Sequence, residues 1–94
     1  MKKSAFLINT ARGPVVKSEA LAAALRDGTI AGAGVDVFDK EPPLDVSDPL
    51  LHAPNLLCTP HVAFATRQAF EKRAVIVGKN LAAFMAGEPI NKIC

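Results

Sequence analysis

The sequence of this chain predicts an α/β fold built on a parallel sheet. Three short apolar runs, at residues 4–9, 32–38 and 56–59, have the length and composition of strands. Helix signals follow the first run and the third. Because strands that alternate with crossover segments form parallel sheets, we expect three strands with flanking helices.

The first strand is expected at 4–9, where a continuous apolar run is typical of a strand buried on both faces. Turn-forming residues at 10–14 end it. Ser18 is expected to cap the helix that follows, and Gly28 to end that helix in a left-handed conformation. The second strand then occupies 32–38.

The segment 39–55 is expected to be an ordered loop, because its four prolines exclude a helix or a central strand. The third strand follows at 56–59. Thr66 is expected to cap a long helix that ends at Gly87. Within this helix, side chains three or four residues apart form one apolar seam, which we expect to cover the sheet. The seam comprises Phe70, Ala74, Val77, Leu81 and Phe84.

Composition excludes several classes of protein. The formal net charge is +2, and the basic residues alternate with acidic ones, so neither nucleic acid nor a membrane surface is a predicted partner. The first apolar run is too short for a signal peptide. Cys58 and Cys94 have no zinc spacing and form no disulfide framework, which indicates free thiols in a reducing compartment. We therefore predict a cytoplasmic chain without a metal site.

Chemically distinctive residues follow each predicted strand. Arg12 follows the first, Asp36 and Glu41 lie at and after the end of the second, and His61 follows the third. Ligands of open parallel sheets bind at the carboxyl ends of the strands. Histidine exchanges protons near neutral pH, a neighbouring carboxylate favours its imidazolium form, and arginine binds carboxylates through a planar fork. Such a set suits the reduction of a 2-oxo acid to a 2-hydroxy acid.

Structural roles remain open for each of these residues from the pattern alone. Asp36 is also compatible with a turn at the end of its strand, and Glu41 with a solvated loop carboxylate. His52 is interpreted as a surface histidine, and Cys58 as a small buried hydrophobic side chain.

Five motifs in order along the chain make it similar to a known family. They are LINTARGPVV at 7–16, AGAGVDVF at 31–38, EPP at 41–43, DPLL at 48–51 and TPH at 59–61. Together they resemble the D-isomer-specific 2-hydroxyacid dehydrogenases. The resemblance implies the C-terminal half of a Rossmann-type parallel sheet, an NAD(P)-dependent oxidoreductase and a small 2-oxo or 2-hydroxy acid substrate.

The resemblance also implies roles for individual residues. Arg12 matches the substrate-binding arginine, His61 the catalytic acid/base and Glu41 the carboxylate that pairs with it. Asp36 matches the acidic residue that holds the nicotinamide carboxamide. Residues matching the lining of the nicotinamide pocket are Thr10, Ala11, Arg12, His61, Val62, Ala63 and Phe64. The sequence V-A-F-A at 62–65 departs from the small residues of many relatives, which leaves the substrate open.

A glycine-rich GxGxxG turn for the cofactor's pyrophosphate is absent from the sequence. Residues 1–94 are therefore expected to be a partial NAD(P)-binding domain without that half and without a substrate domain, and to be inactive alone. The residues that would select NAD or NADP are absent as well. The alternative is a non-catalytic module that binds proteins or associates with itself. Since residues 6–8 are predicted to form an exposed apolar sheet edge, we expect a homo-oligomer.

Overall fold

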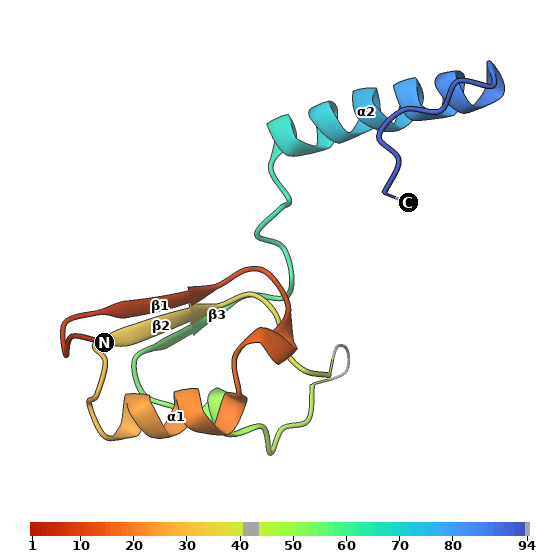
Figure 1. Cartoon of the computed structure of the whole chain (residues 1–94). Coiled ribbons are helices and arrows are strands. Elements are labelled where there is room, and N and C mark those ends of the chain that lie inside the picture. The colour runs from red at the N-terminus through yellow and green to blue at the C-terminus, as the bar shows by residue number, and fades with distance from the viewer. Residues whose placement is uncertain (41–43, 94) are drawn as a thin grey trace. The chain divides into compact units, whose positions relative to one another are not determined.

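A computed structural model describes residues 1–40 and 44–93 of the chain (Figure 1). The chain divides into two compact units, residues 1–63 and 64–94. Within the described residues, no helix is both long and apolar enough to span a membrane.

The first unit is a three-stranded parallel sheet in the order β1-β2-β3. Its strands are β1 (Phe6–Asn9), β2 (Gly32–Val35) and β3 (Leu56–Cys58). The helix α1 (Ser18–Arg26) connects β1 to β2 and lies against one face of the sheet (Figure 1). The predicted parallel α/β architecture is confirmed, with strands shorter than expected.

The described part of this unit also contains two 3-10 turns: η1 (Gly13–Val15) follows β1, and η2 (Pro49–His52) lies within the proline-rich loop. The side chain of Asp48 caps η2 by accepting a hydrogen bond from the amide of Leu50 at 2.9 Å. Leu50 is buried, so this loop closes part of the core.

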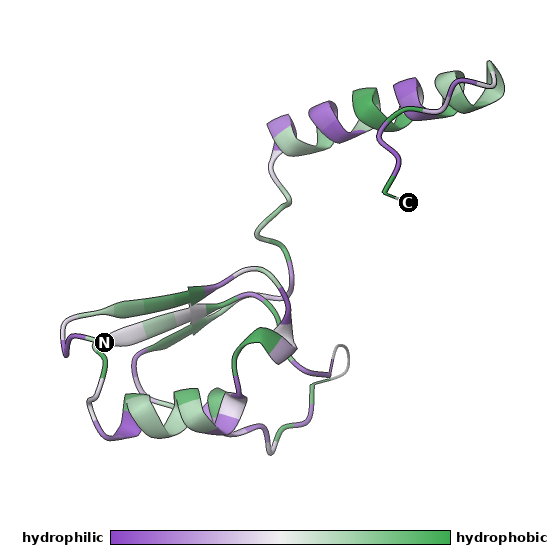
Figure 2. Cartoon of the chain, viewed as in Figure 1, coloured by the Kyte–Doolittle hydropathy of each residue, from purple (hydrophilic) through white to green (hydrophobic). Residues whose placement is uncertain are grey.

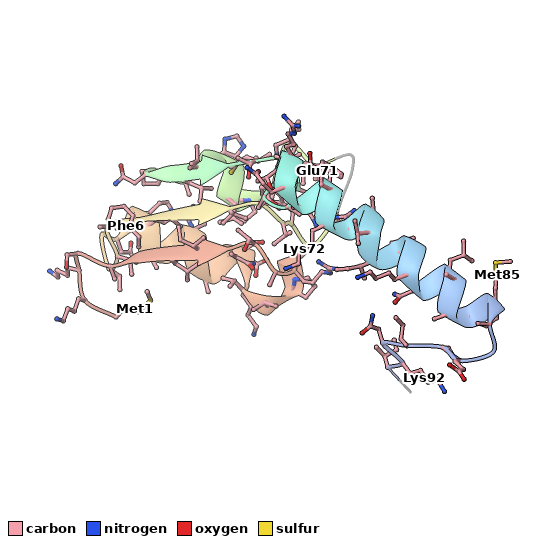
Figure 3. The ribbon with its side chains drawn as sticks, turned by 90° about the horizontal axis from the view of Figure 1, so that it is seen from above. Met1, Phe6, Glu71, Lys72, Met85 and Lys92 are labelled. Atoms are coloured by element: carbon pink, nitrogen blue, oxygen red, sulfur yellow. The ribbon has the colours of Figure 1, made fainter. Side chains whose placement is uncertain are left out.

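The core lies between α1 and the sheet face it covers. Its buried members are Leu21, Ala22, Leu25, Ile30, Ala33, Val35, Phe38 and Leu50. On the opposite face Phe6, Ile8 and Leu57 are each 68–69% exposed, and Figure 3 looks onto that face, with Phe6 labelled. The expectation that the first strand is buried on both faces is therefore wrong, because α1 covers one face and no described element of this unit covers the other.

The residues expected to begin and end α1 take the predicted roles, with one exception. Gly28 has φ +65° and lies just beyond α1, as predicted. The amides of Gly28 and Thr29 donate to the carbonyls of Leu25 and Ala24, which closes the last turn. Ser18, however, is the first residue of α1 and makes no capping bond; Lys17 occupies the N-cap position.

The second unit contains the helix α2 (Arg67–Met85). Thr66 caps it by accepting a hydrogen bond from the amide of Ala69, and Gly87 follows its end with φ +79°, both as predicted. Hydrophilic and hydrophobic residues alternate along it (Figure 2). No residue of α2 is buried. That the apolar seam of this helix covers the sheet stays a prediction, because the seam and the sheet belong to different units.

Candidate functional site at the carboxyl ends of the strands

The turn that carries Arg12 is shaped by a buried amide. Asn9, the last residue of β1, is 5% exposed. Its Nδ2 donates to the carbonyl oxygen of Arg12 at 3.0 Å, and its Oδ1 accepts from the amide of Ala11 at 3.1 Å. Both halves of the Asn9 side chain thus fold residues 10–12 over the strand end. Arg12 itself is exposed and donates from Nη1 to the carbonyl of Ala11.

Gly13 allows this turn to lie close to the chain after β2. A Cβ atom at position 13 would stand 2.1 Å from the carbonyl carbon of Phe38. Since no side chain fits in that space, the glycine after Arg12 is required by the close approach of two backbones.

Asp36 ties the end of β2 to the segment after β3. Its side chain is 2% exposed. Its Oδ1 accepts from the Thr59 hydroxyl and from the amide of Val62, and its Oδ2 accepts from the amide of Ala63, both amides at 2.8 Å. Burial alone would raise the pKa of this carboxyl. The hydrogen bonds from Thr59, Ala63 and Val62, with the charge of His61, together hold the pKa below its usual value.

His61 lies at the centre of that segment, in an unusual backbone conformation. Its φ is +56°, in the left-handed region that residues with a side chain rarely adopt. The two amides that follow it bond to Asp36, and its own amide donates to the carbonyl of Thr59 at 3.1 Å. Together these hydrogen bonds hold the backbone of His61 in its unfavourable conformation. Strained backbone of this kind is common at functional positions.

The structure brings most of the predicted site residues to one sheet edge. The amide of Asp36 donates to the carbonyl of Asn9, and the amide of Thr59 donates to that of Val35, which aligns the three strand ends. Thr10, Ala11, Arg12, Asp36, His61, Val62 and Ala63 all follow these ends in the first unit. Glu41 lies outside the described residues.

Phe64 belongs to the second unit, where its ring contacts Phe70 and Arg73. Its ring meets that of Phe70 edge to face, with centroids 5.8 Å apart, and the guanidinium of Arg73 lies 4.7 Å from its centroid. The guanidinium of Arg73 thus packs on the rings of both Phe64 and Phe70.

Asn9 and Thr59 were missed as site-forming residues. An Asn that directly follows an apolar run, and a Thr directly before Pro-His, were the available signals. The imidazole Nε2 of His52 lies 2.8 Å from the carbonyl of Val46 on the surface, which agrees with its interpretation as a surface histidine.

Cys58 was expected to be buried, but it is exposed. Partial desolvation and the charge of Asp48 raise the pKa of its thiol, which disfavours the reactive thiolate. Among the described residues, no group of three or more His, Cys, Asp or Glu side chains could hold a metal ion.

Comparisons with known proteins bear on this site. Residues 1–63 match the family described as D-isomer specific 2-hydroxyacid dehydrogenase, NAD binding domain. A glyoxylate reductase of Thermofilum pendens is 51% identical over 88 residues, and a glycerate dehydrogenase of Methylorubrum extorquens is 52% identical over 95 residues. The alignments cover 94% and 99% of this chain, but 26% and 30% of those relatives.

A solved structure shows the same fold. The D-isomer specific 2-hydroxyacid dehydrogenase of Xanthobacter autotrophicus Py2, in complex with NADPH and MES, matches 97% of this chain and 36% of its own with a TM-score of 0.75 and 44% identity. The three-stranded parallel sheet with its helices is thus part of a Rossmann-type fold, as predicted.

Proposed function

Because this chain belongs to the D-isomer specific 2-hydroxyacid dehydrogenase family, within its NAD binding domain, we propose that it forms part of an oxidoreductase acting on a D-2-hydroxy acid and its 2-oxo acid. The observation that carries this proposal is the gathering of Arg12, Asp36 and His61 at the carboxyl edge of one parallel sheet. Ligands of such sheets bind at that edge.

The described residues fit the nicotinamide end of a dinucleotide. Exposed residues at 10–11 and 62–63 border the edge, beside the carboxylate of Asp36. The sequence contains no GxGxxG turn for the pyrophosphate. Residues 1–63 thus correspond to part of an NAD(P)-binding domain. A bound nicotinamide would supply or accept the hydride.

The chain's own residues then take distinct roles. The exposed guanidinium of Arg12 binds the substrate carboxylate. His61 gives a proton to the carbonyl oxygen on reduction and removes it from the hydroxyl on oxidation. The family resemblance assigns to Glu41, which lies outside the described residues, the role of the carboxylate that pairs with His61. Thr10, Ala11, Val62 and Ala63 line the nicotinamide pocket, and the family resemblance alone assigns Phe64 to it.

We propose that the 94-residue chain alone has little or no activity, since hydride transfer requires a cofactor held against the substrate. A suitable test replaces the matching quarter of the Thermofilum pendens glyoxylate reductase with this chain and follows NADH or NADPH oxidation with glyoxylate. We expect turnover by the chimera. His61→Gln should lower kcat by about 10²–10⁴-fold, and Arg12→Gln should chiefly raise KM.

His52→Gln is the matched control, because the exposed His52 lies in the proline-rich loop and contacts the carbonyl of Val46, and it should leave both constants unchanged. A folded chimera whose turnover is insensitive to His61→Gln would contradict the proposed roles. Substantial turnover by the isolated chain would contradict its inactivity.

Self-association is the second candidate, favoured by the uncovered sheet face. Phe6 and Ile8 on the edge strand β1, and Leu57 on β3, expose apolar surface that a second copy could cover. Sedimentation velocity should show a dimer or larger oligomer. A monomer at high concentration would contradict this candidate. We propose that the chain is located in the cytoplasm, since Cys58 is a free thiol.

A further inference from the structure

We propose that Thr59 is a positioning residue for His61, acting through the carboxylate of Asp36. This inference rests on the proposed function, in which His61 is the acid/base. The Thr59 hydroxyl and the amide of Val62 donate to the same oxygen, Oδ1 of Asp36, and the amide of Ala63 donates to Oδ2. One carboxylate directly after β2 therefore holds the chain on both sides of His61.

The need for such a clamp follows from the backbone of His61. At φ +56° it occupies a region that is unfavourable for a residue with a Cβ atom. It also follows a proline and precedes the exposed residues 62–66, so its neighbours in sequence supply little packing. The bonds to Asp36 offset this cost and fix the direction in which the imidazole leaves the sheet edge.

Thr59 donates to Asp36 from its side chain, whereas Val62 and Ala63 donate from their backbone amides. A substitution at position 59 can therefore remove its hydrogen bond. Amide donors are present whatever residue stands at 62 or 63. The Thr59 hydroxyl is the side-chain donor to this buried carboxylate among the described residues. Thr59→Val keeps the branched shape and removes the hydroxyl, whereas Thr59→Ser keeps the hydroxyl.

The test is nuclear magnetic resonance on the full 94-residue chain, which requires no catalytic activity. In the unmodified chain, His61 should show the strong intraresidue NOE between its amide and Hα protons that a positive φ produces. In Thr59→Val this NOE should weaken, and the amides of Val62 and Ala63 should exchange roughly ten-fold faster or more, as loss of a bond to a charged group implies. Thr59→Ser should restore both.

The amide of Ser47 is the internal control, because it donates to the carboxylate of Asp45 at 2.9 Å in a separate loop. It should be unchanged in both variants. An unchanged NOE and unchanged exchange at 62 and 63 in a folded Thr59→Val chain would overturn the proposal.

If Thr59→Val does not fold, acid titration of the unmodified chain decides instead. Protonation of Asp36 should weaken the His61 NOE and the bonds at 62 and 63, and no change through that titration would overturn the proposal. In the chimera, Thr59→Val should lower kcat more than it raises KM. An inactive chimera with positive resonance results would refute the proposed function and leave the positioning role standing.

Discussion

The two helices of this chain have similar ends and different surroundings. A glycine with positive φ lies just beyond the end of both α1 and α2, and in both an equivalent pair of hydrogen bonds closes the last turn. Yet α1, with nine residues, buries Leu21, Ala22 and Leu25, whereas α2, with 19 residues, buries none. Helix termini are therefore decided by nearby sequence, while burial depends on which surface faces the helix.

This difference predicts unequal energetic roles for leucines in the two helices. Leu25 is 3% exposed in the core, and Leu81 is 59% exposed on α2. Leu25→Ala should lower the free energy of unfolding by about 2–5 kcal/mol, because it leaves a cavity. Leu81→Ala should change it by about 0.5 kcal/mol or less. Urea denaturation monitored by circular dichroism measures both, and equal losses would break the comparison.

Substitutions at two glycines should change the stability of the chain in opposite directions. Gly13→Ala forces a Cβ atom against the Phe38 backbone and should cost about 1–3 kcal/mol or more. Gly78 lies within α2 with open space around its Cα. Gly78→Ala should therefore stabilise α2 by about 1 kcal/mol through helix propensity. Thermal and urea unfolding of the two variants should move in opposite directions, and a shift in the same direction would contradict the account.

A smaller, pH-dependent effect is expected from Asp36. Its folded pKa lies below the ordinary value of 3.8, so its carboxylate contributes stability that is fully present above that value. This contribution is lost as pH falls through the lowered folded pKa. Unfolding free energies measured from pH 7 down to strong acid should decline less steeply in Asp36→Asn than in the unmodified chain. Equal slopes would show that Asp36 does not couple proton binding to folding.

Sequence patterns predicted much of the fold because they act locally. Thr66, Gly28 and Gly87 cap or end helices through bonds to residues within one turn. The three strands were also predictable, since parallel pairing follows from apolar runs separated by crossovers. Cys58 and the outer face of β1 were predicted incorrectly, because exposure depends on which elements cover the sheet.

The sequence predicted which residues form the site, but it did not predict the hydrogen bonds that hold them in place. Arg12, Asp36 and His61 follow the three strands, so topology places them at one edge. The bonds from Thr59, Val62 and Ala63 to Asp36 span 23 to 27 residues of sequence, and no local pattern encodes them. Such contacts exist only once the strands have paired.

Amide hydrogen exchange along the chain tests most directly the claim that His61 belongs to a fixed sheet edge. We predict that the amides of Val62 and Ala63 exchange as slowly as those of β2, while amides in α2, which has no buried residue, exchange much faster. Exchange at 62 and 63 as fast as in α2 would contradict it, since the predicted acid/base would then lie on a loose linker.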